Sequence, residues 1–534
     1  MSKTVFAWLL LSGLWLGDAR AAAAIPAGSD AFVLDLNDAG TRARIKDAGG
    51  AITNDGPGGT LAVRFTLEAK EPGVTAARNV VTFPVDVSRL LGAHVMLVAK
   101  VRGQDIRSAD PAKKLAANQG IELRLVLPSG SGKNWPATPP PHGTFDWRDA
   151  SHRTEIRAPA PKAAVSIGLT GAVGTVWLSD MRLHVLHSPV GLPKATATTR
   201  AAAANARTTL RGVMSPGKFN IKDFADLQKW NVNLIRWQIT GAHQAPSWQA
   251  WLDKQLAELP RALDAAAAHN IKFIIDFHSK PGGNKTSSKT TRMLMEKEYA
   301  DEFVAIWETI VRRHKDHPAL YAYDLVNEPV QYMPSPAGVD DWYALQVRAA
   351  RAIRAIDPKT PIMFETEYFD SPWAFAWLKP VDLPNIIYQA HVYFPHTYTH
   401  QGVITDQGLA DGKNYAAGQR YPGIISGAHY DKESLRKHVQ PIRDFQLATG
   451  APIFIGEFSA ARWAPGAAQY IDDCISLFEE YGWNWTYHAF RESTIWDVEH
   501  VDDSPRAKPV RTPADQPTER QKVLLKWFAK NNTR

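Results

Sequence analysis

The stretch Tyr321-Ala322-Tyr323-Asp324-Leu325-Val326-Asn327-Glu328-Pro329 is the part of the sequence on which the interpretation of the fold depends. It predicts a buried strand that ends at a proline, with the amide of Asn327 and the carboxylate of Glu328 presented just before the break. The alternative is a turn in which both side chains simply face water. Other strands in the same part of the chain end in the same way, and this favours the first interpretation.

From Leu210 onward, short apolar strands alternate with helical patterns, which predicts βα units around a parallel sheet. The expected strands are Thr209–Met214, Asn233–Ile239, Lys272–Phe277, Leu320–Val326, Pro361–Glu365, Ile386–Tyr393, Pro452–Glu457 and Trp483–His488. Eight strands, each followed by a helix, predict a (β/α)8 barrel over residues 208–534. An open doubly wound sheet is the alternative, but no glycine-rich phosphate-binding turn follows the first strand.

Residues 30–187 show a different pattern, in which apolar and polar residues alternate and helical stripes are nearly absent. Several such strands, separated by turn residues, predict an antiparallel β-sandwich. The closing segment Ala163–Leu186, which includes residues 174–180, resembles the last two strands of jelly-roll carbohydrate-binding modules. Candidates for a sugar-stacking face are Trp135, Phe145, Trp147 and Trp177. Residues 188–207 are rich in Ala, Thr, Lys and Arg, which predicts a linker or, alternatively, a short helix from Ala201 to Ala206.

The first 21 residues fit a secretory signal, because Lys3 precedes an apolar run and Ala19-Arg20-Ala21 forms a cleavage site. No later segment is apolar for long enough to cross a bilayer. The sequence therefore predicts a secreted protein, periplasmic or extracellular, without membrane association after signal cleavage. We also expect a monomer.

Charge and cysteine content argue against several classes of function. The net charge of +7 is modest for 534 residues and the basic side chains are scattered, which argues against a nucleic-acid partner. The one cysteine, Cys474, falls on the apolar face of a predicted helix, so we expect a buried thiol and no disulfide. No cofactor, metal or redox role is expected.

Polar residues recur at or just after the carboxyl ends of the predicted barrel strands. They are Arg236, His278, Asn327 with Glu328, His391 with Tyr393, and Glu457. Because these strand ends meet at one rim of a barrel, the residues are expected to form one site. Two carboxylates facing each other across a cleft are what glycosidic bond cleavage requires, one to protonate the leaving oxygen and one to stabilise or attack the developing oxocarbenium ion.

Barrel geometry gives an estimate of the separation of this pair. Strands about 4.8 Å apart and tilted by about 36° give a radius near 8 Å, so Cα atoms three strands apart lie roughly 14 Å from each other. Two inward glutamates shorten this to roughly 6 or 7 Å between carboxyl groups. This estimate supports a paired site without deciding between retaining and inverting mechanisms.

In order and strand position, these residues resemble glycoside hydrolase family five, the large cellulase family. The resemblance runs from about Thr209 to Phe528. It implies a retaining mechanism with Glu328 as acid/base and Glu457 as nucleophile. It also implies that Tyr393 hydrogen-bonds the nucleophile, that Asn327 reaches the sugar 2-hydroxyl, that Arg236 keeps Glu457 ionised, and that His278 and His391 line the catalytic subsite.

One position departs from the family pattern. Where the family commonly has a sugar-stacking tryptophan after strand eight, this chain has His488, and either His488 or Trp496 from the following loop is expected to take that place. The preferred polysaccharide depends on this platform.

Other candidate sites are less consistent with the sequence. His391, His396 and His400 lie close together but lack regular helical metal-ligand spacing, and no Gly-x-Ser-x-Gly elbow is present. Glu365 and Glu367 form a second carboxylate pair for which a structural role is expected. The sequence therefore predicts an endo-acting β-1,4-glucanase acting on a polysaccharide or oligosaccharide. The alternatives are a β-mannanase or xyloglucanase with the same carboxylates, or a barrel that binds polysaccharide without cleaving it.

Overall fold

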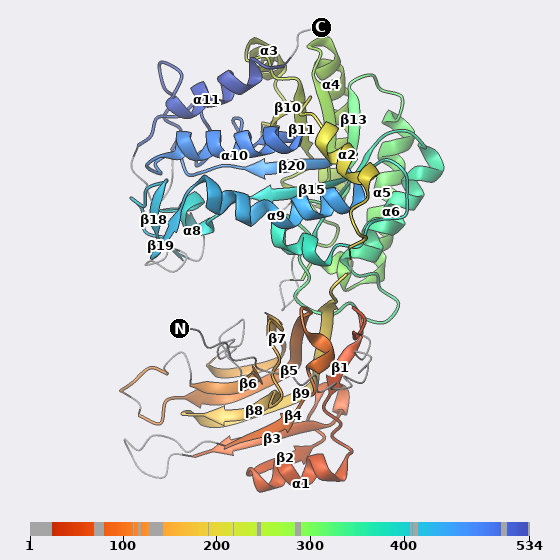
Figure 1. Cartoon of the computed structure of the whole chain (residues 1–534). Helices are drawn as coiled ribbons and strands as arrows, with labels where there is room; N and C mark the ends of the chain where they lie inside the picture. The colour runs from red at the N-terminus through yellow and green to blue at the C-terminus, as the bar shows by residue number, and fades with distance from the viewer. Residues whose placement is uncertain are drawn as a thin grey trace, which may run out of the picture. The chain divides into compact units, whose positions relative to one another are not determined.

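A computed structural model describes residues 24–68, 79–110, 112–115, 119–127, 142–190, 192–216, 218–242, 247–283, 290–405, 408–409, 415–503 and 510–531. The predicted signal segment, residues 1–21, and Trp135 lie outside the described residues. The chain divides into two compact units, with the main boundary between Ser188 and Pro189 (Figure 1). None of the helices within the described residues is both long and apolar enough to span a bilayer.

The first unit is built from two antiparallel sheets, as the alternating pattern predicts. Strands β2 (Gly50–Thr53), β3 (Ala62–Leu67), β9 (Val173–His187), β5 (His94–Arg107) and β7 (Gly143–Glu155) form one sheet in that order, and β1 (Asp30–Val33) pairs with β9. Strands β4 (Asn79–Pro84), β8 (Ala164–Thr170) and β6 (Gly120–Val126) form the other. The core between the sheets comes from alternate residues such as Val63, Phe65 and Val176, none of which is exposed to solvent.

Helix α1 (Ala39–Asp47) was not predicted in this unit. It buries only Ile45, so it has no apolar stripe to reveal it. Its one sequence signal is Asp38, whose carboxylate accepts the Thr41 backbone N–H at 2.7 Å as an N-cap.

Two of the candidate sugar-stacking residues of this unit are buried. Phe145 is 9% exposed and packs over Gly103, where any side chain would collide with its ring. Trp177 is 7% exposed, with the Arg102 guanidinium 3.9 Å from the centre of its ring. Trp147 is half-buried. The face offered by Trp177 is therefore occupied by Arg102.

The second unit contains a closed barrel of eight parallel strands, and every strand lies at a predicted position. They are β10 (Arg211–Met214), β11 (Leu234–Gln238), β12 (Lys272–Asp276), β13 (Leu320–Asp324), β14 (Ile362–Glu365), β15 (Ile386–Val392), β20 (Ile453–Phe458) and β21 (Asn484–Tyr487). The prediction of a (β/α)8 barrel is confirmed.

The barrel interior is layered, because side chains two residues apart on a strand point the same way. The lowest layer is apolar and consists of Leu234, Ile274, Ala322, Met363, Ile387 and Phe454. Two residues further along the same strands come Arg236, Asp276, Asp324, Glu365, Gln389 and Gly456. All the polar members of this middle layer are 0% exposed. The middle layer is thus a buried polar level on an apolar floor.

Seven helices follow barrel strands and cover the outside of the barrel. They are α3 (Ile221–Lys229), α4 (Trp248–Ala268), α5 (Lys297–His314), α6 (Trp342–Ile356), α9 (Lys432–Thr449), α10 (Ala467–Tyr481) and α11 (Glu519–Phe528). On α10, the lone thiol of Cys474 is buried and unpaired, as expected. The connection after β14 differs from the prediction, which expected a helix there. Residues 366–385, which are described throughout, hold only the four-residue turn α7 (Glu367–Asp370) and the short 3-10 helix η5 (Pro372–Trp377).

The segment expected to be a linker, residues 188–207, includes helix α2 (Ala197–Asn205). Thr196 caps it by accepting the Thr199 backbone N–H at 3.1 Å. The helix packs against α9, with Ala203 buried.

Candidate active site

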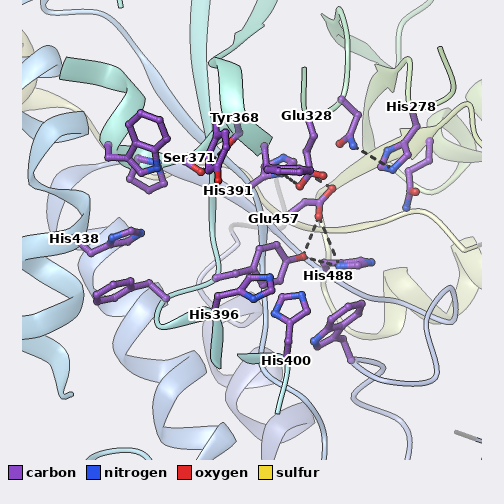
Figure 2. Close-up of a pocket in the computed structure, with 18 of the residues that line it drawn as sticks. His278, Glu328, Tyr368, Ser371, His391, His396, His400, His438, Glu457 and His488 are labelled. Atoms are coloured by element: carbon purple, nitrogen blue, oxygen red, sulfur yellow. Dashed lines mark hydrogen bonds and ion pairs between the residues drawn. The ribbon is translucent and has the colours of Figure 1, made fainter. Parts of the chain in front are cut away.

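The carboxyl ends of the barrel strands open into a cavity of about 760 Å³. Of the residues predicted to form the site, His278, Asn327, Glu328, His391, Tyr393, Glu457, His488 and Trp496 line it. In Figure 2, Glu328 and Glu457 point toward each other with His391 beside them. Arg236 lies below the cavity in the middle layer and is completely buried.

Arg236 is the central cation of the middle layer. Its Nε donates to Asp324 Oδ2 at 2.7 Å, and its Nη2 donates to Glu365 Oε1 at 2.9 Å. Nη2 also lies 3.3 Å from Asp276 Oδ1. Burial acts to lower the pKa of Arg236, but the surrounding carboxylates raise it well above its usual value. The guanidinium is therefore a permanent positive charge directly beneath the cavity.

Glu457 is held by the middle layer from below and by Tyr393 from above. Its Oε1 accepts from Arg236 Nη1 at 3.0 Å, and its Oε2 accepts from the Tyr393 hydroxyl at 2.9 Å. Burial acts to raise the pKa of Glu457, but positive groups around it, His391 foremost, hold that pKa well below its usual value. The Glu457 side chain is thus a fixed carboxylate at the floor of the cavity.

Glu328 follows β13 in a backbone conformation that is uncommon for a residue with a side chain, with φ at 46°. Its backbone N–H donates to Glu365 Oε2 at 2.6 Å, which anchors this conformation. The Glu328 carboxylate is 27% exposed and accepts from His391 Nδ1 at 2.9 Å through Oε1. Glu365, expected to be structural, therefore links Arg236 to the backbone of Glu328.

The two glutamates are close enough to act on one bond. Atoms of Glu328, His391 and Glu457 that could serve as ligands all lie within 4.8 Å of one another. One carboxylate oxygen of Glu328 therefore lies within 4.8 Å of one of Glu457, as a facing pair requires. The register between β15 and β20 shifts after Ala390, where Gly456 of β20 is left without a partner and His391 pairs with Glu457.

Asn327 and His278 form a second group on the same rim. Asn327 accepts from Arg236 Nη2 at 3.1 Å through Oδ1 and donates to His278 Nε2 at 3.2 Å through Nδ2. The other nitrogen of His278, Nδ1, lies 3.0 Å from Asp276 Oδ2. Both side chains are therefore oriented by the middle layer, and one N–H of the Asn327 amide is left for another acceptor.

His488 and Trp496 meet beside Tyr393. His488 Nδ1 lies 2.7 Å from the Tyr393 hydroxyl and Nε2 lies 2.7 Å from Glu492 Oε2. Burial acts to lower the pKa of His488, but Glu492 raises it above its usual value. The rings of His488 and Trp496 are 5.1 Å apart, and both line the cavity. The two hydrogen bonds fix the orientation of the His488 ring, and Trp496 lies beside it in the cavity wall.

The histidines of the β15 loop do not gather with His391 as ion ligands. His396 and His400 stack with ring centres 3.7 Å apart, while His438 of α9 stacks on Phe394 at 4.0 Å. Burial lowers the pKa of His438 to about 4. Among the described residues, the groups that could hold an ion are Glu328 with His391 and Glu457, and Glu365 with Asp370 and His391.

Sequence reasoning did not identify several residues of the site. Asp276 and Asp324 lie inside strands that were predicted, and a charged residue at an inward strand position was a usable signal. Asp370, Glu492 and His438 come from loops and a helix, whose positions the strand pattern does not determine. The cavity wall also contains Tyr368, Phe369 and Trp373 from the segment after β14.

Comparison with known proteins gives concordant similarities. The profile of one family, described as Cellulase (glycosyl hydrolase family 5), matches residues 201–493, more than half of the chain. Endoglucanase C of Acetivibrio thermocellus is 26% identical over 253 residues, which cover 43% of this chain and 72% of that protein. Endoglucanase 3 of Fibrobacter succinogenes is 29% identical over 139 residues, or 26% of this chain and 20% of that protein. Among solved structures, endoglucanase Cel5A of Thermotoga maritima aligns with 56% of this chain and 94% of its own at 21% identity, with a TM-score of 0.46.

Proposed function

The chain belongs to the cellulase family, glycosyl hydrolase family 5, and on that basis we propose that it cleaves internal bonds of β-1,4-glucan with retention of anomeric configuration. The single observation that carries the proposal is the pair Glu328 and Glu457, whose nearest oxygens lie within 4.8 Å across the cavity. Retaining enzymes place their two carboxyl groups about 5–5.5 Å apart, whereas inverting enzymes leave room for a water between them.

In the first step, Glu457 attacks the anomeric carbon and the glycosidic C–O bond breaks. Glu328 gives its proton to the leaving oxygen, so the leaving sugar departs as a neutral alcohol. The assignment of roles is supported by the environments of the two groups. Glu457 is bound by Arg236 and Tyr393, which favour its ionised form, while Glu328 is partly exposed and can exchange protons.

In the second step, a water attacks the anomeric carbon and the ester bond to Glu457 breaks. Glu328, now ionised, takes the proton of that water. The same side chain therefore acts as acid and then as base, which requires a hydrogen-bonding partner that accommodates both states. His391, at 2.9 Å from Glu328, is that partner.

The other predicted site residues are assigned to substrate binding and orientation. The free N–H of Asn327 is placed to donate to a sugar hydroxyl, with His278 beside it. Trp496 is the sugar-stacking platform, and His488 holds the Tyr393 hydroxyl against Glu457. The proposal includes export of the protein, a monomeric state, and no metal in the reaction.

The mechanism is tested by proton NMR of the first product released from a β-glucan oligosaccharide. We expect the β-anomer to form first, and an early α-anomer would show inversion instead. Reducing-sugar release from carboxymethylcellulose, mixed-linkage glucan, xyloglucan and mannan tests the substrate. Preference for mannan or xyloglucan would replace the glucan assignment, and binding without any release of reducing ends would overturn hydrolysis altogether.

A further inference from the structure

Carboxylates outnumber cations in and just above the middle layer. Asp276, Asp324, Glu365 and Asp370 are 0% exposed and Glu457 is 5% exposed, and Arg236 is the one permanent cation among them in the described part of the chain. An ionised carboxylate without a partner is costly to bury, so such a cluster retains protons. The location of those protons is therefore part of the structure of the site.

His391 occupies the centre of this cluster. Its Nδ1 bonds Glu328, and its Nε2 lies 3.9 Å from Asp370 Oδ2, 3.9 Å from Glu457 Oε1 and 4.0 Å from Glu365 Oε1. Nε2 is buried and has no hydrogen-bond partner among the described residues. An imidazole that faces a carboxylate at each nitrogen is best satisfied when both nitrogens carry hydrogens.

Asp370 reaches His391 from an unusual turn. Tyr368, Phe369 and Asp370 have φ values of 67°, 61° and 51°, a left-handed run that costs about 1–2 kcal/mol for each residue. Oδ1 of Asp370 accepts from the Thr366 backbone N–H at 2.7 Å and from Thr366 Oγ1 at 3.0 Å. Oδ2 is buried, has no hydrogen-bond partner in the described structure, and faces His391. Strain of this kind persists where the surrounding contacts impose a particular geometry.

We propose that Asp370 is a positioning residue that keeps His391 charged and oriented, so that His391 Nδ1 stays on Glu328 while Glu328 alternates between acid and base. This inference rests on the proposed role of Glu328. At pH 7 an independent glutamate and an independent histidine would both be mostly deprotonated. The pair Glu328 and His391 instead holds one exchangeable proton more. Asp370 acts through His391 and does not touch the substrate.

The charges around both groups support this arrangement. Burial acts to lower the pKa of His391, but Glu457, the Glu328 hydrogen bond and Asp370 raise it to about 9. Burial raises the pKa of Asp370 to about 8, against the opposing effect of His391. Other titratable groups around the cluster are Tyr393 just after β15, Asp324 on β13, His278 and Lys280 after β12, and His488 after β21.

Protons satisfy this cluster better than a metal ion would. Glu365, Asp370 and His391 could converge on an ion. However, Glu365 Oε1 already accepts from Arg236 Nη2 at 2.9 Å and from Gln389 Nε2. A divalent cation bound there would lie next to the guanidinium charge, which disfavours it electrostatically.

The first experiment uses the unmodified protein, with ¹⁵N-labelled histidine and the His391 signal identified by its absence in His391→Asn. In EDTA-treated protein we expect both ring nitrogens of His391 to carry hydrogens at pH 7 and to titrate with a pKa near 9. A neutral ring at pH 7 would overturn the proposal. So would a change in the assigned His391 signal when Zn²⁺ is added at stoichiometric amounts, because His391 would then be a metal ligand.

The second experiment compares Asp370→Asn with Glu367→Gln. Glu367 is a matched control, because it lies in the same turn, is equally buried, and accepts the Gln331 backbone N–H at 2.9 Å. With a pKa of about 8, Asp370 is ionised in the pH range in which His391 loses its proton, and Asp370→Asn removes that negative charge. The alkaline limb of kcat/KM and the His391 titration should therefore both move down by about one pH unit or more. Glu367→Gln should leave both in place.

A lower kcat in Asp370→Asn with an unmoved alkaline limb and an unmoved His391 titration would assign Asp370 a merely structural role and refute the proposal. The NMR titration does not depend on catalysis. If the protein proves inactive on every glycan but His391 titrates as expected in both variants, the proposed function fails while the positioning role of Asp370 stands.

Discussion

At the scale of single residues, Arg236 is the side chain that connects most groups of the site. It bonds Asp324, Glu365 and Glu457 from one completely buried guanidinium. Removing one member of a buried ion cluster leaves the others uncompensated, which typically costs about 3–5 kcal/mol. The stability of the barrel and the ionisation of Glu457 therefore depend on the same side chain.

Arg236→Met should lower the free energy of unfolding by about 3–5 kcal/mol, measured by urea denaturation. Arg236→Lys is the matched control, since it keeps the positive charge but lacks the planar guanidinium that contacts several carboxylates at once. Its free energy of unfolding should fall by less than that of the methionine variant. A loss of under about 1 kcal/mol in the methionine variant would mean that the carboxylates simply take up protons in place of the guanidinium.

The two glutamates should respond differently to the same truncation. Glu457→Ala should abolish turnover on every substrate, because no glycosyl ester can form. Glu328→Ala should keep a rapid first step on a nitrophenyl glycoside, whose leaving group needs no protonation, and then release sugar slowly. Stopped-flow absorbance checks this as a burst of nitrophenol, and azide should attack the glycosyl ester that accumulates in Glu328→Ala, restoring turnover with a β-glycosyl azide as the product. An equal loss of turnover in both variants, without a burst, would show that this assignment of roles is wrong.

The residues of the site were predictable where the strand pattern determines their position. Glu328 and Glu457 end apolar strands, so their convergence follows from barrel topology alone. Asp370 could not be predicted in this way, because its position depends on a left-handed backbone run that the aromatic residues Tyr368 and Phe369 disfavour. The pairing of Glu457 with His391 depends on an extra residue in β20, Gly456, that the strand pattern does not reveal.

At the scale of elements, the segment after β14 is the main departure from a regular barrel. Its left-handed turn directs Asp370 inward and leaves Phe369 44% exposed at the cavity wall. The strain is localised, which makes it accessible to measurement by substitution.

Phe369→Gly should leave stability unchanged or raise it by up to about 1 kcal/mol, because glycine relieves the left-handed conformation while adding its own entropic cost. Ile424→Gly is the matched control, an exposed apolar residue in β18 (Gly423–Ile425) without positive φ, and it should lose about 0.5–1 kcal/mol. Thermal unfolding of both variants checks this. Equal destabilisation would show that the Phe369 side chain compensates for its backbone.

Element prediction succeeded where burial produces a periodic pattern and failed where it does not. All eight barrel strands were found because both of their faces are buried and most of their residues are apolar. Helix α1 was missed because a single buried residue makes no stripe. The helix expected after β14 is absent from the described segment 366–385, where Pro372 and the left-handed turn interrupt any longer helix.

At the scale of the whole molecule, the two units differ in the periodicity of their apolar residues. Alternation predicted antiparallel sheets and βα repetition predicted the barrel, and both are confirmed. Composition alone was less informative at the boundary. Residues 188–207 contain few large apolar side chains, yet α2 lies there and packs on α9.

Shortened chains should reveal where the catalytic unit begins. A chain starting at Lys194 keeps α2, whereas one starting at Ala206 loses it, and we expect the second to be less stable by about 1–2 kcal/mol because the surface of α9 is uncovered. Both should retain activity on soluble oligosaccharide, since α2 does not line the cavity. Equal melting temperatures would place the boundary of the unit after α2.

The buried thiol of Cys474 makes the opening rate of the catalytic unit measurable. Cys474 is the single cysteine of the chain, so a thiol reagent can react only there, and its side chain on α10 is 1% exposed. A chromogenic disulfide reagent can therefore modify it only when α10 leaves the barrel, and at saturating reagent the colour develops at the rate of that opening. The unaltered protein would then report how often its catalytic unit opens under working conditions, and whether a bound glucan slows that opening, without any attached label.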